Sequence, residues 1–339
     1  MEKKLNILVY SGGEVIGDAL YKLNFFDYLR NCYPNSNITL VAGEGSSEYS
    51  SNLKIFGDKL FNYIKENIRF FSKKLFLIKY FNSCPLKKKF DVVIDTQSDY
   101  RTTLLLKKIK TDIFISYSIN WFFSDLKPKN KKIESLNDRL LKMVDLLNHF
   151  YKINKVSKKE FSIVLPKNYD QKSRQVLSSR KKYFGIAPGA GDPRKIWPLD
   201  NFIKVVRIFG HEYTPVFFLG PSEKNLEKKL KKIFPSSIFP NTTSFAQDNI
   251  SGPLFVISLA RRLDFCLSND SGVGHMFAHA KIPQLLIYSL GNPKKYKPLN
   301  ENTIIVDSKK WRSKSPKVIP VDYVVSKIKF LINKNKQFY

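Results

Sequence analysis

The loop Asn269–His275 has the composition of a phosphate-binding turn. It follows an apolar, strand-like run and opens a helix-like segment, so the first backbone N–H groups of that helix can meet an anion. Gly272 and Gly274 would let a phosphate approach the backbone, and the helix dipole favours its charge. Asp270 and Ser271 precede these glycines in the loop, and His275 ends it. A simple helix cap by Asp270 or Ser271 is the alternative, but it leaves the glycines unexplained.

A metal site is not predicted. His275 and His279 are four residues apart, as zinc-binding pairs can be, yet neither an HExxH motif nor a third ligand accompanies them. The three cysteines are far apart and form neither a CxxC pair nor a disulfide framework, which is typical of a reducing compartment. They are Cys32, Cys84 and Cys266.

Two series of alternating strand-like and helix-like segments must position such residues. The first comprises strands Leu5–Tyr10, Asn37–Ala42, Phe90–Asp95 and Ile113–Tyr117 with helices Asp18–Cys32 and Thr102–Lys110. The second comprises strands Tyr183–Ala187, Pro215–Leu219, Phe265–Leu267 and Gln284–Tyr288 with helices Leu199–Phe209, Ser222–Phe234 and Gly272–Ala280. This alternation predicts two α/β domains with parallel sheets, and 339 residues are enough for two cores.

The expected domain boundary lies in the polar, basic and weakly patterned stretch Lys152–Lys182, which reads as a linker. We therefore expect an N-terminal domain over residues 1–165 and a second domain over 166–320. Residues 321–339 are expected to form a C-terminal helix and tail, with the helix over Val321–Ile332.

The net charge of +29 favours a polyanionic partner: nucleic acid, an acidic membrane leaflet or a phosphorylated glycan. A lysine-rich codon bias is the alternative explanation. With 43% apolar and 26% charged residues the chain has the composition of a folded protein. It shows neither a secretory signal nor an apolar run of about 18 residues that could span a membrane.

The segment Lys54–Lys89 holds ten basic residues against two acids, and aromatic residues are interleaved with them. Such a segment suits a membrane surface, because rings enter the interface while lysines meet anionic headgroups. The alternative is a pair of helices that packs on the sheet and turns its charged face to water.

Four patterns occur together in the order and spacing of one family. They are Ile7–Asp18, Asp91–Gln97 followed by Tyr100 and Arg101, Gly185–Pro198, and Ser268–Pro283. Together they resemble the bacterial heptosyltransferases of glycosyltransferase family 9, which build the lipopolysaccharide inner core. The resemblance implies the GT-B architecture: two Rossmann-like domains that face a cleft. The N-terminal domain would hold the acceptor and the C-terminal domain the nucleotide sugar.

For the donor, the resemblance implies that the loop after the strand holds the diphosphate, with Asp270, Ser271, Gly272 and His275 as the donor-binding residues. It also implies two further contacts. Lys195 stands where the family has a lysine that neutralises phosphate charge, and Arg194 could share that task. Glu223 stands where the family has an acidic residue near the nucleoside, although a carboxylate in a first helical turn also interacts favourably with the helix dipole. Ala190 and Gly191 replace the hydroxyl residues that many members carry.

For the acceptor, Asp18 occupies the Gly-Asp position of the family's proposed general base. An inverting transfer needs a carboxylate that takes the proton of the attacking hydroxyl. An N-cap role for Asp18 is the alternative, and Glu14 is the second candidate base. Gln97 and Arg101 close a strand and could meet an anionic acceptor, or could form a salt bridge at the rim.

The expected activity is therefore transfer of a sugar, heptose from ADP-heptose, to a lipid-linked saccharide of the lipopolysaccharide core. The nucleotide sugar would be a substrate, with neither metal nor cofactor, and the enzyme would work in the cytoplasm at the inner face of the inner membrane. One alternative is a GT-B enzyme that uses another nucleotide sugar or acts as an epimerase. A basic nucleic-acid-binding protein is the other, but the chain has no RNP, zinc-finger or helix-turn-helix pattern.

Overall fold

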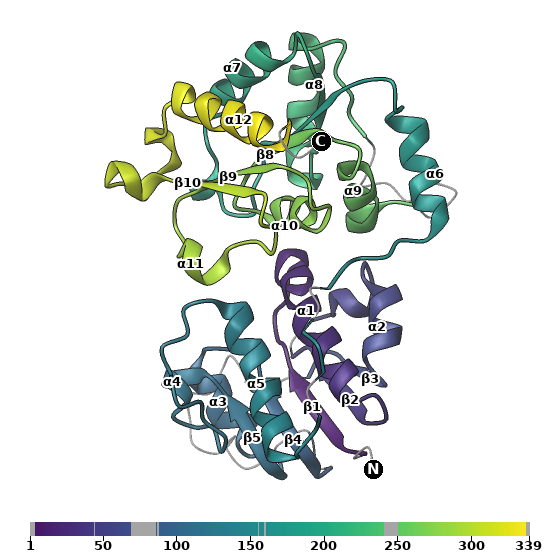
Figure 1. Cartoon of the computed structure of the whole chain (residues 1–339), viewed down its shortest axis with the longest axis vertical. Helices are drawn as coiled ribbons and strands as arrows, with labels where there is room; N and C mark the ends of the chain where they lie inside the picture. Colours follow the sequence, from purple (N-terminus) through teal and green to yellow (C-terminus); the bar gives the residue numbers. More distant parts are fainter. Residues whose placement is uncertain are drawn as a thin grey trace. The chain divides into compact units, whose positions relative to one another are not determined.

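The chain forms two compact units, Met1–Phe161 and Ser162–Tyr339, each built around one parallel sheet (Figure 1). The computed structural model describes residues 4–43, 45–68, 86, 88–154, 156–158, 161–240 and 250–336. The division falls four residues before the expected boundary at residue 165.

The sheet of the N-terminal unit has the strand order β3-β2-β1-β4-β5. Its strands are β1 (Asn6–Tyr10), β2 (Asn37–Val41), β3 (Tyr63–Lys65), β4 (Phe90–Asp95) and β5 (Thr111–Ser116). All neighbours are parallel, and Ile7 lies opposite Ile38 on one side and Val92 on the other. The central strands are continuous buried apolar runs, because helices cover both faces of a sheet of this kind.

The helices of this unit are α1 (Ile16–Cys32), α2 (Lys54–Leu60), α3 (Tyr100–Leu106), α4 (Ser118–Trp121) and α5 (Leu136–Phe150). α1 packs along α5, where the amide of Asn24 donates to the side-chain oxygen of Asn137 at 3.0 Å. The expected helix Thr102–Lys110 is in fact the earlier and shorter α3. In Lys54–Lys89 the described part forms α2 and the edge strand β3, whereas residues 69–85 and 87 lie outside the described residues.

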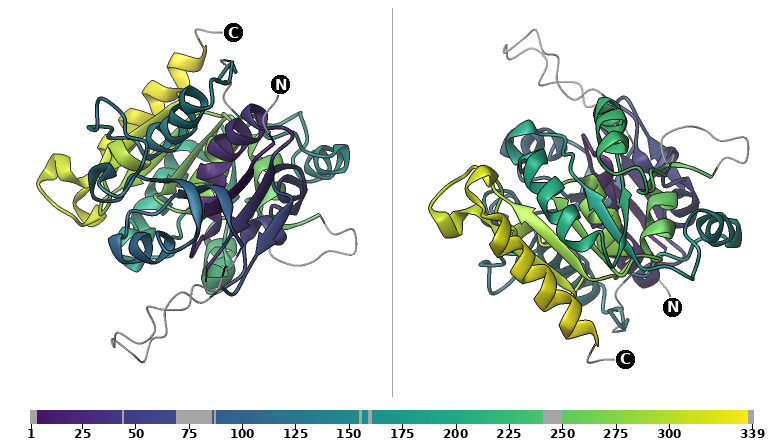
Figure 2. Two further views of the ribbon diagram at one scale, coloured as in Figure 1. Left: turned by 90° about the horizontal axis from the view of Figure 1, so that it is seen from below. Right: turned by 90° about the horizontal axis from the view of Figure 1, so that it is seen from above.

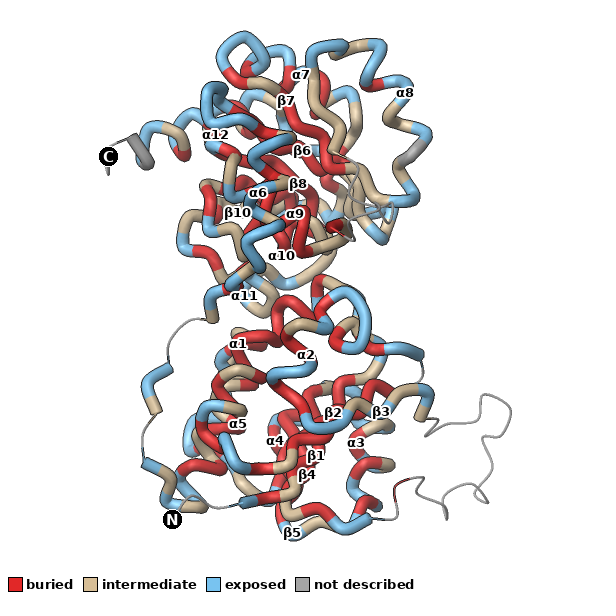
Figure 3. The backbone as a smooth tube through the Cα atoms, turned by 90° about the vertical axis from the view of Figure 1, so that its right-hand side faces the viewer, coloured by how far each residue is buried: buried red, intermediate tan, exposed pale blue. Residues whose placement is uncertain are grey.

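The sheet of the second unit has the order β10-β9-β8-β6-β7, again with every neighbour parallel. Its strands are β6 (Tyr183–Ala187), β7 (Thr214–Phe217), β8 (Phe265–Asn269), β9 (Gln284–Tyr288) and β10 (Thr303–Asp307). The buried residues follow the strands, as the tube coloured by burial shows (Figure 3).

The helices of the second unit are α6 (Lys167–Val176), α7 (Leu199–Phe209), α8 (Lys224–Ile233), α9 (Gly252–Ala260), α10 (Gly272–His279), α11 (Pro293–Tyr296) and α12 (Val321–Lys336). α12 packs on α7, β9 and β10, and buries Val324 and Ile328 in the core of this unit (Figure 2). The C-terminal helix is thus part of the second unit and not a separate tail.

The predicted linker Lys152–Lys182 is only partly a linker. It contains the helix α6, which packs on α9, where the Ser258 hydroxyl donates to the backbone oxygen of Tyr169 at 2.9 Å. The sequence did not predict α6, because the helix has few apolar residues and only Ser173 is fully buried. Within the described residues, no helix combines the length and apolar character needed to cross a membrane.

Candidate functional site

Each sheet has one point at which the chain reverses the direction in which strands are added. In the N-terminal unit it lies between β1 and β4, and in the second unit between β6 and β8. Parallel sheets bind ligands outside the carboxyl ends of the strands at such points, because the two connecting loops diverge there. The loops at these two points carry almost all of the residues that the sequence singled out.

In the second unit, Lys195 and Asp270 meet across the two loops. Lys195 ends a 3₁₀ turn after β6, and its Nζ lies 2.7 Å from Oδ2 of Asp270, which follows β8. The lysine side chain keeps 31% of its surface exposed and the aspartate 11%. The pair therefore places a partly accessible cation beside the first turn of α10.

Asn269 fixes the same two loops, although it is not among the predicted site residues. Its side-chain oxygen accepts the backbone N–H of Trp197 at 3.0 Å, and its amide donates to the backbone oxygen of Pro188 at 2.7 Å. Asn269 is fully buried, so both bonds form away from competing water. The position of an Asn at the end of an apolar strand, just before Asp-Ser-Gly, could have indicated this role in the sequence.

The first turn of α10 is capped and accessible. Ser271 is its N-cap, and the Ser271 hydroxyl accepts the backbone N–H of Gly274 at 3.4 Å. The capping interpretation is therefore correct for Ser271 and not for Asp270, which pairs with Lys195. Gly272 and His275 lie partly exposed in this turn. An anion can approach here, because a cap satisfies only part of the free N–H set.

Gly274 has a packing role that the spacing of the motif did not indicate. It is buried, and a Cβ at this position would lie 3.0 Å from Cδ1 of Leu286 and 3.2 Å from the backbone oxygen of Asn269. A side chain at this position would therefore push α10 away from β8 and β9.

Glu223 lies on the neighbouring loop, after β7. Its Oε2 accepts the backbone N–H of Gly220 at 2.7 Å, and a Cβ on Gly189 would come within 2.5 Å of its carboxyl carbon. The carboxylate thus rests against the loop after β6, which also leads to Lys195. Arg194 does not contact Asp270 as Lys195 does. Its side chain is 77% exposed and pairs with Asp192 at 2.7 Å, and this contact lowers the pKa of the Asp192 carboxyl to about 2.

In the N-terminal unit, Asp18 lies in the first turn of α1 and its carboxylate is exposed. The N-cap position is Val15, which offers no side-chain bond, so the capping interpretation of Asp18 is wrong. Within the described residues its carboxylate has neither a hydrogen-bond partner nor an ion-pair partner. Such a carboxylate is available to a ligand.

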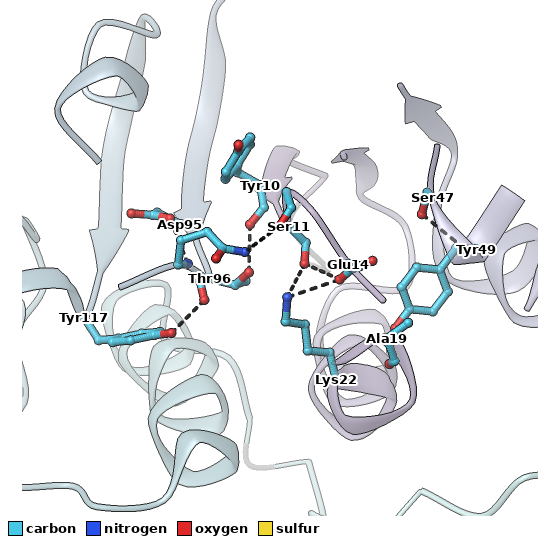
Figure 4. A network of polar contacts seen from close by, with 12 residues as sticks. Tyr10, Ser11, Glu14, Ala19, Lys22, Ser47, Tyr49, Asp95, Thr96 and Tyr117 are labelled. Carbon is cyan, nitrogen blue, oxygen red and sulfur yellow. Dashed lines mark hydrogen bonds and ion pairs between the residues drawn. The ribbon is translucent and has the colours of Figure 1, made fainter. Parts of the chain in front are cut away.

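Glu14 is buried instead of facing solvent. Its side chain is 1% exposed, accepts from the Ser11 hydroxyl and pairs with Nζ of Lys22 at 3.2 Å (Figure 4). Lys22 also donates to the Ser11 hydroxyl. An enclosed carboxylate that is paired with a lysine does not suit a proton acceptor for a substrate. Glu14 and Lys22 fasten the β1–α1 loop that carries Asp18, a contact that the sequence did not indicate.

Asp95 ends β4 inside the same unit and is fully buried. Its carboxylate accepts from the Thr103 hydroxyl at 2.6 Å, the Ser116 hydroxyl at 2.9 Å and the backbone N–H of Gln97 at 2.9 Å. Burial raises the pKa of Asp95 to about 6, and these hydrogen bonds oppose the rise. Asp95 thus holds together the loops that follow β4 and β5.

The two predicted acceptor residues differ in their surroundings. Gln97 donates from Nε2 to the backbone oxygen of Gly12 at 3.2 Å, which joins the loop after β4 to the loop after β1. Arg101 is exposed on α3, and its Nε donates to the hydroxyl of Tyr100 at 3.3 Å. Asp99, the N-cap residue of α3, also acts on Arg101 and contributes to the raised pKa of the guanidinium, after the contact with Tyr100. Among the described residues, no three His, Cys, Asp or Glu side chains are grouped to hold a metal ion.

Comparison with known proteins gives one consistent result. Residues 85–319 match the model of glycosyltransferase family 9 (heptosyltransferase). Lipopolysaccharide core heptosyltransferase OpsX of Haemophilus influenzae is 22% identical over 292 residues, which are 84% of this chain and 79% of that protein.

Solved structures of similar proteins share the fold. A glycosyl transferase family 9 structure from Veillonella parvula has a TM-score of 0.69 at 21% identity, and covers 98% of this chain and 99% of its own. The E. coli heptosyltransferase WaaC with ADP has a TM-score of 0.65 at 15% identity, with 96% and 99% covered. Two parallel five-stranded sheets with this likeness give the chain the GT-B fold that the motifs predicted.

Proposed function

The chain belongs to glycosyltransferase family 9 and is a glycosyltransferase, and from this premise we propose its reaction. It transfers heptose from ADP-heptose, with inversion at the anomeric carbon, to a lipid-linked saccharide of the lipopolysaccharide core. The similarity to OpsX, a lipopolysaccharide core heptosyltransferase, and to WaaC, solved with ADP, supports this donor and this acceptor.

The observation that carries the donor assignment is the ion pair of Lys195 with Asp270 beside the first turn of α10. As the glycosidic bond breaks, the leaving ADP gains negative charge. A fixed ammonium group and free backbone N–H groups stabilise that charge more in the transition state than in the ground state. Asp270 orients the lysine, and Glu223 lies on the adjoining loop. Its Oε1, which has no hydrogen bond to a described residue, can accept from ribose hydroxyls.

Asp18 is the proposed general base. Its exposed carboxylate, which has no partner in the described part of the chain, takes the proton from the acceptor hydroxyl while the hydroxyl oxygen attacks the anomeric carbon. The bond from that carbon to the diphosphate oxygen breaks, and ADP leaves with the electron pair. Gln97 and Arg101 would contact the acceptor, with the exposed guanidinium of Arg101 suited to a phosphate group.

A panel of nucleotide sugars tests the donor. ADP-heptose, ADP-glucose, UDP-N-acetylglucosamine and GDP-mannose are compared first by thermal shift and then by nucleotide release with a core saccharide acceptor. We expect the largest shift, and acceptor-dependent release, with ADP-heptose. A preference for a uridine nucleotide, or conversion of the sugar without an acceptor, would remove the proposed donor and favour the epimerase alternative.

We expect turnover without a divalent metal. Lys195 and the N-terminus of α10 supply the positive charge that a metal ion supplies in other transferases. Turnover after dialysis against EDTA should equal that of the untreated enzyme, measured by ADP release. A loss that added Mg²⁺ or Mn²⁺ restores would contradict the expectation.

The proposed place of work is the cytoplasmic face of the inner membrane, with peripheral contact, because a lipid-linked acceptor is held there. The net charge of +29 suits an anionic leaflet.

A further inference from the structure

Two short neighbouring elements of the N-terminal unit expose large apolar side chains. On α3, Tyr100 is 46% exposed and Leu104 is 42% exposed; on and just after α4, Ile119 is 54% and Phe122 is 67% exposed. α3 and α4 lie side by side (Figure 1) and contact each other, so the four side chains come from neighbouring elements. We call them the apolar cluster. Contiguous exposed apolar side chains mark an interaction site more often than scattered ones do.

The backbone under this cluster is strained. Ile119, Asn120 and Trp121 have φ angles of 43°, 52° and 66°, in the left-handed region. That region suits Asn but disfavours a β-branched Ile, and such strain persists only where the surroundings enforce it.

The surroundings do enforce it. The Trp121 side chain is 1% exposed and anchors the turn, while the backbone N–H of Phe122 donates to the oxygen of Ile119 at 3.1 Å. The Tyr117 hydroxyl donates to the backbone oxygen of Thr96 at 2.8 Å, which joins this turn to the loop after β4 (Figure 4). The fold thus keeps the side chains of Ile119 and Phe122 exposed to solvent on a rigid turn.

Positive charge adjoins the cluster along the chain, and Nζ of Lys127 donates to the backbone oxygen of Phe122 at 3.1 Å. A run of exposed lysines follows it: Lys127, Lys129, Lys131 and Lys132. Arg101 is exposed on α3 within the cluster itself. Among the acids of this stretch, Asp125 is paired with Lys107 at 3.0 Å and Asp99 caps α3 through the backbone N–H of Thr102. Glu134, which follows the lysines, is one acid against four lysines. The surplus charge of this surface is therefore positive.

The cluster lies at the edge of the sheet that carries the proposed base. β1, β4 and β5 are parallel neighbours, so their carboxyl ends meet at one edge. Asp18 follows β1, α3 follows β4, and α4 follows β5. If this edge of the sheet docks on another surface, the loop that carries Asp18 comes close to that surface.

We propose that the apolar cluster and the lysine run 127–132 dock the N-terminal unit on an anionic lipid bilayer. Phe122, Ile119, Leu104 and Tyr100 enter the interfacial layer, and the lysines contact the headgroups. A bilayer fits better than a protein partner, because the cores of protein interfaces are depleted of lysine. This inference rests on the proposed function in one respect only: a lipid-linked acceptor gives the docking its purpose.

Vesicle sedimentation tests the docking with neither donor nor acceptor present. The full chain is mixed with vesicles of phosphatidylcholine alone, or with phosphatidylglycerol added. We expect binding to the anionic vesicles that decreases as salt rises. The double variant Ile119→Asn/Phe122→Asn keeps the net charge and should bind about tenfold or more weakly. Asn tolerates the left-handed region at position 119, and Phe122 is 67% exposed, so this variant should melt no lower than the wild type.

The matched control is Val164→Asn/Phe330→Asn, which also removes two exposed apolar side chains, 77% and 59% exposed, but from the second unit. It should bind as the wild type does. A second variant, Lys129→Gln/Lys131→Gln, should bind more weakly and with a shallower salt dependence.

Four results would overturn the proposal: undiminished binding by the double Asn variant, equal weakening in the control, no preference for anionic vesicles, or a wild-type dimer that the double Asn variant splits. The last would make this face an interface between copies. If docking behaves as expected while the nucleotide-sugar panel gives no turnover, the docking surface stands and the proposed reaction fails.

Discussion

At the scale of single residues, two carboxylates of the same unit have opposite surroundings. Asp18 is exposed and unpaired within the described chain, whereas Glu14, four residues earlier, is enclosed and bound to Lys22. Asp18 can therefore take a proton from a ligand, and Glu14 stabilises the loop. We expect Asp18→Asn to lower turnover by about a hundred- to ten-thousand-fold while donor affinity changes little, because a base acts in the transition state.

Single-turnover ADP release and calorimetric ADP affinity measure the two quantities. Asp27→Asn is the matched control, since it makes the same charge change later in α1. A rate for Asp18→Asn within about twofold of wild type would show that this carboxylate is not the base, since a lost base costs at least about a hundredfold.

Asp95 predicts a pH dependence of stability. Its pKa of about 6 lies above the ordinary 3.8, so the folded state keeps a proton that the unfolded state releases. The stability that Asp95 contributes is therefore present below about pH 4 and is lost as pH rises to about 6, by roughly 3 kcal/mol in all.

Asp95→Asn should remove this contribution. Urea midpoints of wild type and variant are compared from pH 4.5 to 7.5, and the difference should move in favour of the variant as pH rises. Other titrating groups cancel in that difference. Parallel curves for the two proteins would show that Asp95 does not change its protonation on folding.

At the scale of elements, the buried parallel strands were predictable and the peripheral elements less so. β1, β4, β6 and β9 are continuous apolar runs, and their predicted bounds agree within a residue. The edge strand β3 has only three residues with a mixed exposure, so no pattern revealed it. α5 was missed although its buried residues Leu140, Val144 and Leu147 follow a helical period.

We predict different roles for two glycines of α10, and substitution can separate them. A Cβ at Gly274 meets Leu286 and Asn269, so Gly274→Val should destabilise the second unit by about 1–3 kcal/mol.

Gly272 is partly exposed in the first turn. We expect Gly272→Val to leave the unit folded and to weaken ADP binding about tenfold or more. Thermal melts and calorimetry measure the two effects. Unchanged ADP affinity in a folded Gly272→Val protein would remove this turn from the donor site.

At the scale of the whole molecule, the motifs predicted the two-sheet fold, because each motif sits at a strand end that the sheet order brings together. The contact of Lys195 with Asp270 joins positions 75 residues apart and depends on β6 lying beside β8. The order of strands in the sheet cannot be predicted from the spacing of residues along the chain. The left-handed turn at Ile119, which the packing of Trp121 enforces, cannot be predicted from it either.

The division into two units predicts where a nucleotide protects the chain. All proposed donor contacts lie in Ser162–Tyr339, and ADP at a hundred times its Kd should stabilise the state that binds it by about 2.7 kcal/mol. Hydrogen exchange should therefore slow most in peptides over 188–195 and 270–275. Lys195→Met keeps the length of the stem but removes the charge, so at equal ADP it should show weaker protection in the same peptides. If ADP protects the peptide over 11–18 most strongly, the nucleotide binds the N-terminal unit, and the assignment of donor and acceptor to the two sheets must be exchanged.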